Sequence, residues 1–393
     1  MKSTADVVIV GGGCMGCSVA WHLAERGISN VVLLERETQL AAGSTGKNAG
    51  GVRHQFSHPA NILLSLESIG MMKQFEGRVG VPIDLHQDGY LFLLSKAANM
   101  AAFRNNLEVQ RAHGVQVQWL SPEEAPAIAP GLDMTGVRGA TYCPDDGVAD
   151  PHGVTQGFAK GALARGVEIV RETEVTGIRL ERGHVAEVRT SRGSIATPIV
   201  VNAAGPWSKS IGRMLGVDVP VEPERRHIFI AQPPGGGSWD DPVHAGQVPS
   251  SKVLVIDFES TFYFHREGKG LLFGMGDSDE TPGFDTTVRW DFLPKVIEVA
   301  IRRLPALADA AVSHAWAGLY EMTPDHNPII GPSEDIEGFY CITGFSGHGF
   351  QHSPAAGRIL ADLISGRDPQ FDHRPFQLSR FAARAISGEA NVV

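Results

Sequence analysis

The sequence lacks long apolar runs, an excess of basic residues and a dense set of cysteines. No apolar run approaches the ~18 residues of a membrane-spanning helix, so we expect no membrane span. Lys and Arg number 34 against 44 Asp and Glu, a net charge of −10, which argues against nucleic-acid binding because that needs a basic surface. Four cysteines are too few for a disulfide scaffold. Cys14 and Cys17 have C-x-x-C spacing, but no second pair completes a zinc site, so we expect no metal.

The start of the chain also lacks the uninterrupted apolar stretch and cleavage site of a signal peptide, so we expect a cytoplasmic protein. At ~150 residues per domain, the length suggests two or three domains. Glycine is abundant instead, at 46 of 393 residues against a usual ~7%. The glycines gather in particular loops, which indicates backbone packed closely against another group.

Residues 1–35 have the pattern of a dinucleotide-binding βαβ unit. An apolar β-branched run predicts a buried strand at 6–10, a helix follows, and a second strand is predicted at 31–34. The turn after the first strand fits the spacing G-x-G-x-x-G with Gly11, Gly13 and Gly16. These glycines allow a tight turn and close approach of a pyrophosphate to the helix N-terminus. Glu35 follows at the spacing of an acid that accepts hydrogen bonds from an adenosine ribose, and we expect the dinucleotide to lie beside Cys14, Met15 and Arg36.

Four further segments favour FAD over NAD. Residues 43–51 are dense in small residues, which suits backbone laid along a flat ring system. Residues 166–178 predict a strand in which the backbone of Val175 hydrogen-bonds an adenine edge, and residues 199–208 predict a strand ending in a small-residue turn. Residues 338–350 form a second glycine-rich strand-to-helix turn, whose helix N-terminus can stabilise an anionic reduced flavin. From these segments we expect cofactor contacts from Ser44, Thr45, Lys47, Asn48, Ala49, Gly50, Gly51, Ala203, Ala204, Gly205, Trp207, Gly344, Phe345, Ser346, Gly347, His348, Gly349, Phe350 and Gln351.

The chain resembles the FAD-dependent D-amino-acid-oxidase-like family, and within it the β subunits of proline dehydrogenase and heterotetrameric sarcosine oxidase. The stretches that carry the resemblance are GGGCMG, STGKNAGGVRHQF, GYLFLL, VNAAGPWS, WAGLYEMTPDHNPIIG and GFSGHGF, in family order. It implies an α/β fold with a Rossmann-type, glutathione-reductase-like FAD-binding domain over 1–84, 145–222 and 323–393. An α+β substrate domain on a mainly antiparallel sheet would take 85–144 and 223–322, where short alternating segments separated by Gly, Pro and Asp are typical of such a sheet.

The resemblance also implies roles for single residues. Arg53 in VRHQF matches an arginine that binds the substrate carboxylate, and its planar fork of donors suits that group. His54 is also a candidate, although an extended segment would point its side chain away from that of Arg53. Tyr320 is expected against the flavin, with a core aromatic as the alternative. His348 is a candidate general base, but we expect its loop to cradle the flavin mainly through its backbone. Two further aromatic residues are candidates for either the pocket wall or the core, Trp207 and Tyr263.

Several positions depart from the pattern of these relatives. Gly318 stands where monomeric sarcosine oxidases carry the cysteine that binds flavin, so we expect FAD to be non-covalent. Pro151, followed by His152, stands where the sarcosine oxidase β subunit binds a second flavin, so covalent FMN is not expected. Gln351 replaces a lysine that helps to hold the carboxylate, and we keep it as a candidate. The stretch GLLFGMG lacks the oxygen-activating lysine, which favours a dehydrogenase over an oxidase.

Together these observations predict FAD-dependent oxidation of a secondary amino acid to the imine, by hydride transfer to flavin N5, with Arg53 holding the carboxylate. An α-type subunit or another electron acceptor is implied as a partner. An oxidase of a primary amino acid such as glycine is an alternative. So is a non-catalytic assembly factor or scaffold, because STGKNAGGVRHQFSHPANILLS also resembles assembly factors of respiratory complexes. A small NAD-dependent dehydrogenase would leave GFSGHGF unexplained. The C-terminal SGEANVV is expected to be frayed.

Overall fold

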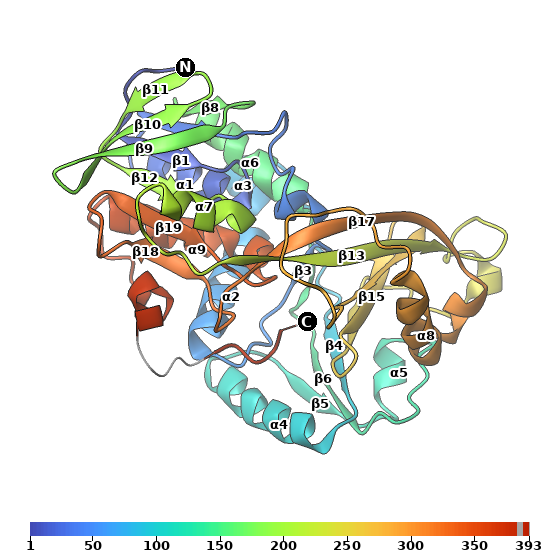
Figure 1. Cartoon of the computed structure of the whole chain (residues 1–393). Coiled ribbons are helices and arrows are strands. Elements are labelled where there is room, and N and C mark those ends of the chain that lie inside the picture. Colours follow the sequence, from blue (N-terminus) through green and yellow to red (C-terminus); the bar gives the residue numbers. More distant parts are fainter. Residues whose placement is uncertain (383–387, 393) are drawn as a thin grey trace.

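The computed structural model describes residues 1–382 and 388–392 (Figure 1). Its first large sheet has six strands in the order β18-β19-β12-β1-β2-β8. All neighbours are parallel except the first pair, which is antiparallel. The strands are β1 (Val7–Val10), β2 (Val31–Leu34), β8 (Glu168–Val170), β12 (Val200–Asn202), β18 (Ile329–Pro332) and β19 (Phe339–Thr343).

Both faces of this sheet are covered. Helices pack on one face, with apolar side chains of β1 and the helices in one core. They are α1 (Cys14–Glu25), α2 (Pro59–Lys73), α3 (Phe75–Val79), α6 (Pro151–Leu163) and α9 (Gly349–Ile364). The other face packs on α7 (Ser208–Arg213) and a three-stranded sheet of β9 (Val175–Glu181), β10 (His184–Thr190) and β11 (Gly193–Ala196). Burial on both faces explains why the strands of this sheet read as continuous apolar runs.

The second large sheet has eight strands in the order β17-β13-β16-β15-β14-β4-β6-β5. Its neighbours are antiparallel except β4 and β14, which are parallel. The strands are β4 (Tyr90–Leu94), β5 (Gln118–Leu120), β6 (Gly139–Cys143), β13 (Glu222–Gln232), β14 (Leu254–Asp257), β15 (Phe262–Glu267), β16 (Gly270–Met275) and β17 (Ala311–Met322). The remaining helices are α4 (Ala97–Ala112), α5 (Ala125–Ile128) and α8 (Leu293–Arg303).

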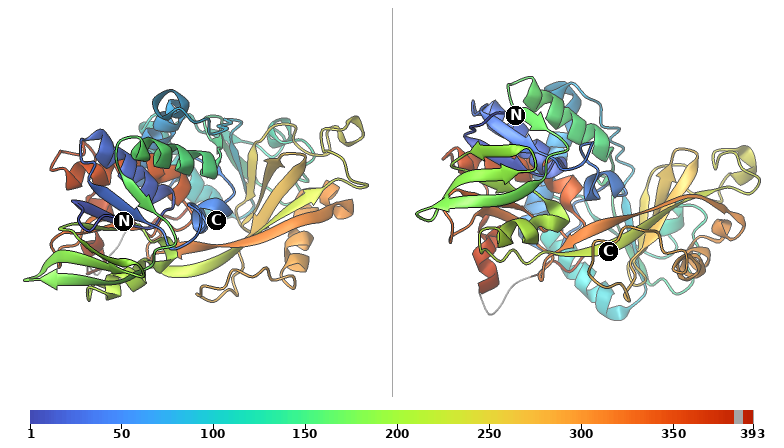
Figure 2. Two further views of the ribbon diagram at one scale, coloured as in Figure 1. Left: turned by 90° about the horizontal axis from the view of Figure 1, so that it is seen from above. Right: turned by 45° about the horizontal axis from the view of Figure 1, so that its top comes forward.

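The chain alternates between the two sheets along the sequence. Strands of the first sheet fall within the ranges predicted for FAD binding, and those of the second fall at 90–143 and 222–322. The domain boundaries themselves stay a prediction, while the mixed-sheet α/β class is confirmed. Figures 1 and 2 show the two halves side by side, and the long antiparallel pair of β13 and β17 runs from the junction along the second half. A short pair of strands, β3 (Gly51–Val52) and β7 (Gly147–Val148), lies beside this junction.

Close packing of α1 on β1 depends on glycine. A Cβ at Gly16 would lie 2.0 Å from the carbonyl oxygen of Gly11, and a Cβ at Gly11 would lie 2.3 Å from that of Ala203. Gly11 also has a φ of +114°, which side chains rarely adopt. Within the described residues, no helix combines the length and apolarity needed to cross a bilayer.

Replacement of Gly16 by alanine tests this packing. We expect Gly16→Ala to push α1 away from β1, to lower the thermal midpoint and to reduce binding of the expected flavin, because Gly11 belongs to the predicted dinucleotide-binding turn. Gly70→Ala is the matched control, since Gly70 lies within α2 and a Cβ there meets no atom within 4 Å. Flavin content by absorbance and thermal unfolding measure both variants, and equal behaviour of the two would contradict the interpretation.

Candidate active site

A cavity of about 670 Å³ lies between the two large sheets and takes its lining from both. From the first sheet come the turn after β1, the end of β2, the turn after β12 and the start of α9, together with the 3-10 helix η1 (Ser44–Lys47). From the second come side chains of β4, β13, β14, β15 and β17. Crevices beyond the carboxyl ends of parallel strands are the usual ligand sites of such sheets. The size lies within the ~300–1,000 Å³ of ligand pockets.

Most residues predicted to contact the cofactor line this cavity. They are Gly11, Gly13, Cys14, Met15, Glu35, Arg36, Ser44, Thr45, Lys47, Asn48, Ala49, Gly51, Val175, Ala203, Ala204, Gly205, Trp207, Gly318, Gly347, His348, Gly349, Phe350 and Gln351. The structure thus brings segments from the N-terminus, the middle and the C-terminus of the chain to one site.

Five predicted residues stand behind the lining and support it: Gly16, Gly50, Gly344, Phe345 and Ser346. Gly50 packs against the carbonyl of Ala149, and its backbone N–H donates to Asn48 Oδ1 at 2.6 Å. Ser346 has a φ of +50°, and its backbone N–H donates to the carbonyl of Glu321 at 3.1 Å. These residues shape the loops that line the cavity.

One end of the cavity has the features of a nucleotide site, and we call it the nucleotide end. It comprises the turn 11–15, Glu35 and Val175. The N-terminus of α1 points its first N–H groups into this turn, and the N–H of Cys14 donates to Thr45 Oγ1 at 3.2 Å. Glu35 accepts from the N–H groups of Gly12 at 2.7 Å and Glu37 at 2.8 Å. A carboxylate has further lone pairs for ribose hydroxyls, so the residues present fit a dinucleotide such as FAD.

Five long side chains gather elsewhere in the cavity, and we call them the arginine–tyrosine cluster: Arg53, Tyr90, Arg226, Tyr263 and Tyr320. The guanidinium of Arg226 lies 4.8 Å from the centre of the Tyr320 ring. Burial raises the pKa of each of the three tyrosines, so all three hydroxyls stay protonated near neutral pH. The cluster offers two cations and three hydroxyls to a small polar ligand.

Arg53 is buried and extensively paired. Its guanidinium donates to the carbonyls of Gln55 and Asn391 and to His348 Nε2 at 3.0 Å. It also lies 3.9 Å from the centre of the Phe56 ring. The backbone N–H of Arg53 donates to Gln351 Oε1 at 2.8 Å, so Gln351 fixes the backbone of the arginine. Burial, and then the charge of Arg53, lowers the pKa of His348 well below its ordinary value, so this histidine stays neutral and accepts through Nε2.

Arg226 was not identified from the sequence. It lies on β13, where side chains alternate, so Arg226 faces the cavity while Arg225 faces the opposite side. Its guanidinium is fixed by Glu224 and by the carbonyl of Arg225 at 3.2 Å. Its buried Nε has no hydrogen-bond partner among the described residues. The alternating apolar pattern of residues 227–231 was the available signal, but the sequence did not show which face of the strand met the cavity.

Glu321 places a half-buried carboxyl group in the cavity wall. Burial raises its pKa, while hydrogen bonds from the backbone of Gly344 and the hydroxyl of Thr343 at 3.0 Å oppose that rise. Gly318, three residues earlier, lines the cavity beside Lys47, and a Cβ there would lie 2.9 Å from the Lys47 Cβ. This position therefore has no side chain that could form a covalent bond with a cofactor.

A family model described as "FAD dependent oxidoreductase" matches residues 6–363. The chain belongs to this FAD-dependent oxidoreductase family. Mitochondrial sarcosine dehydrogenase of Mus musculus is 30% identical over 97% of the chain, which spans 42% of that protein's length. FAD-dependent oxidoreductase domain-containing protein 1 of Xenopus laevis is 33% identical over 99% of the chain and 85% of the relative. The solved structure of L-proline dehydrogenase from P. horikoshii has a TM-score of 0.89 and 33% identity, covering 98% of this chain and all of that one.

The family match establishes FAD as the cofactor of this oxidoreductase and confirms the resemblance noted in the sequence. The curated relatives that carry dehydrogenase names are amino-acid dehydrogenases of about twice the length of this chain. The roles of individual residues towards FAD or substrate stay predictions.

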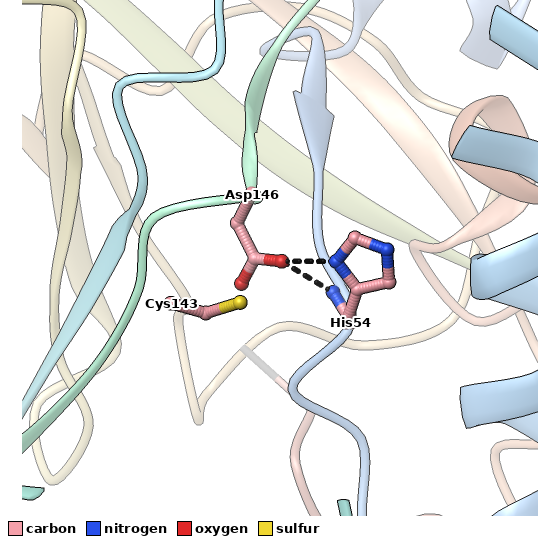
Figure 3. Close-up of side chains that lie close together, drawn as sticks. All are labelled: His54, Cys143 and Asp146. Atoms are coloured by element: carbon pink, nitrogen blue, oxygen red, sulfur yellow. Dashed lines mark hydrogen bonds and ion pairs between the residues drawn. The ribbon is translucent and has the colours of Figure 1, made fainter. Parts of the chain in front are cut away.

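His54, predicted as a candidate, does not line the cavity of this FAD-dependent oxidoreductase. Figure 3 shows its ring directed at Asp146, with Cys143 beside them. Asp146 Oδ1 accepts from both the backbone N–H and Nδ1 of His54 at 2.7 Å, and Oδ2 accepts from Gln55 Nε2 at 3.0 Å. Burial raises the pKa of the Cys143 thiol. The geometry is that of a hydrogen-bonded network that holds residues 53–55 in place behind the site.

The C-terminal segment 388–392 packs on residues 53–58, so the expectation that this end of the chain is frayed was wrong. Ser387 and Val393 lie outside the described residues. The carboxylate of Glu389 is 2% exposed and accepts from Ser57 N–H at 2.8 Å and hydroxyl at 2.7 Å, and from His58 N–H at 3.0 Å. Asn391 donates to the carbonyl of Gln55 and accepts from Arg53. The segment therefore helps to bury and balance the charge of Arg53.

We expect Glu389→Gln to destabilise the protein by about 2 kcal/mol, because a buried carboxylate that accepts several N–H donors loses an acceptor atom. Urea unfolding measures the change. The control is Glu334→Gln, whose carboxylate is exposed and bonds the Ser379 hydroxyl at the surface. A Glu389→Gln variant as stable as the control would show that the segment contributes nothing to the order of this region.

Proposed function

We propose that this protein oxidises a secondary amino acid, N-substituted or cyclic, to the imine, with the substrate carboxylate held by Arg53 and Arg226. The observation that carries the proposal is the arginine–tyrosine cluster, which places two buried or half-buried guanidinium groups in the same cavity as the nucleotide end. Guanidinium groups bind carboxylates through paired N–H donors. The named activities of the amino-acid dehydrogenases among its relatives support the same class of reaction.

The chain's own residues would bind and orient the substrate and exclude water. FAD, held without a covalent bond, supplies the hydride acceptor when bound. The tyrosines and Arg226 shape the pocket around the amine, and Leu254 and Ile256 give it an apolar wall. His348 Nε2 already accepts from Arg53, and the tyrosine hydroxyls are protonated, so the substrate amine would have to bind in its neutral form.

We also propose a dehydrogenase rather than an oxidase, with an α-type subunit or a quinone as acceptor. Within the described residues, Lys47 is the one lysine that lines the cavity, and β16 has none. The related oxidases carry an oxygen-activating lysine in the strand that matches β16, and the lack of a lysine in this strand favours another acceptor. We place the protein in the cytoplasm because its four cysteines are free and buried.

Anaerobic titration of the purified yellow protein with amino acids tests the proposal. We expect proline, hydroxyproline or sarcosine to bleach the flavin at concentrations at least about 10-fold below those needed for glycine. In air, peroxide release should be slow compared with reduction of an artificial acceptor. Bleaching by glycine first would favour the primary-amine alternative, and no bleaching by any amino acid would favour a non-catalytic flavoprotein.

Replacement of Arg226 tests the carboxylate site. We expect Arg226→Met to lower kcat/KM for the amino acid by about 10- to 100-fold, mostly through KM, because a charged hydrogen bond to substrate is lost. Arg226→Lys should retain part of the affinity. The control is Arg104→Met, whose guanidinium lies 3.9 Å from the Trp119 ring and outside the cavity. An Arg226→Met variant with an unchanged KM would exclude a carboxylate contact there.

A further inference from the structure

An aromatic stack stands at the nucleotide end of the cavity. The rings of Trp207 and Phe284 are stacked, with centroids 5.5 Å apart and planes 20° apart. The guanidinium carbon of Arg36 lies 3.8 Å from the centre of the same Trp207 ring. All three side chains line the cavity. Arg36 directly follows Glu35, and a Cβ on Gly43 would touch Trp207 at 3.8 Å, so the stack lies beside the expected adenosine and phosphates.

Phe284 reaches this end from the other half of the molecule. It belongs to residues 276–291, which connect β16 to α8 of the eight-stranded sheet. Thr286 from the same segment also lines the cavity. The Phe284 side chain is 49% exposed, so it stands at the boundary between the cavity and solvent. Contact with Trp207 removes part of the Phe284 ring from water, and the rest of the ring stays exposed to solvent.

The segment is anchored from the far side of β13. Arg225, buried and facing away from the cavity, bonds both carboxylate oxygens of Glu280 at 3.1 Å and Asp285 Oδ2 at 2.7 Å. It also donates to the carbonyl of Thr287 at 3.1 Å, while the N–H of Gly283 donates to the carbonyl of Pro223 at 2.9 Å. These bonds hold the residues on both sides of Phe284, and they position its ring over Trp207.

We propose that residues 276–291 form a clasp over FAD, in which Phe284 closes the nucleotide end and slows release of the cofactor. The clasp links the two halves of the molecule through the contact between Phe284 and Trp207, and no residue of the arginine–tyrosine cluster takes part in this contact. Its role is therefore in retention of the dinucleotide, and it is separate from recognition of the amino acid. The inference holds for FAD whatever substrate the protein oxidises.

The test is the rate of FAD release from gel-filtered holoprotein, followed by flavin fluorescence after dilution, together with FAD titration of the apoprotein. We expect Phe284→Ala to raise the release rate about 3- to 10-fold, the effect of losing one aromatic pair, and Phe284→Tyr to restore it. Asp285→Asn should give a smaller increase, because it weakens the anchor without touching the cavity. At saturating FAD, the KM for the amino acid should be unchanged in all three variants.

Trp290→Ala is the matched control, because Trp290 is an exposed aromatic of the same segment, at 59%, and does not line the cavity. Its release rate should equal that of the wild type. Wild-type release from Phe284→Ala would overturn the proposal, as would equal increases in Phe284→Ala and Trp290→Ala. A raised KM with unchanged FAD release would also overturn it, because Phe284 would then belong to the entrance for substrate. The release rate and the FAD titration do not depend on which amino acid is oxidised, so failure of the clasp and failure of the proposed function are distinguishable.

Discussion

The buried guanidinium of Arg53 constrains the structure around the site. A charge removed from water is costly unless its surroundings supply polar partners. Here the partners come from distant parts of the chain: a carbonyl beside the arginine, His348 at the start of α9, and a carbonyl of the C-terminal segment. The ring of Phe56 lies against the guanidinium at 3.9 Å, and the ring of Phe92 lies 5.6 Å away. Each partner must hold its position for the charge to be tolerated, so one side chain ties together segments that are otherwise independent.

The protonation states near Arg53 follow from this constraint. Burial and the neighbouring positive charge keep His348 neutral, and burial with the same charge lowers the pKa of His352 to about 3. The negative charge that balances Arg53 lies on Glu389 and Asp146, each fixed by several donors. Positive charge at the site is therefore concentrated on guanidinium groups, which stay ionised at every physiological pH. An anionic substrate would therefore meet guanidinium charges that mild acid does not change.

The cavity is a product of the junction between two sheets. The first sheet supplies backbone: glycine-rich turns and helix N-termini that approach a cofactor closely. The second supplies side chains, since the cavity-facing positions of β4, β13 and β15 carry Tyr90, Arg226 and Tyr263. This division explains how one family can keep its cofactor site while its substrates differ. The backbone turns cannot change without steric conflict, whereas residues on an antiparallel sheet can be exchanged singly.

The sequence by itself determined the nucleotide half of this protein. A Cβ at Gly16 would lie 2.0 Å from a backbone carbonyl oxygen, so this position requires glycine, and the requirement is visible in the sequence. A buried apolar strand and an acid at the end of a strand are equally visible. Those motifs predicted the βαβ unit, the second glycine turn at 344–350 and more than half of the cavity lining on that side. Only the tertiary structure decided that Arg226 faces the cavity and His54 faces Asp146, that Glu389 and Asn391 return to Arg53, and that Phe284 meets Trp207. These contacts join residues far apart in the chain, and their geometry depends on strand register and on the junction of the sheets, which no local pattern encodes.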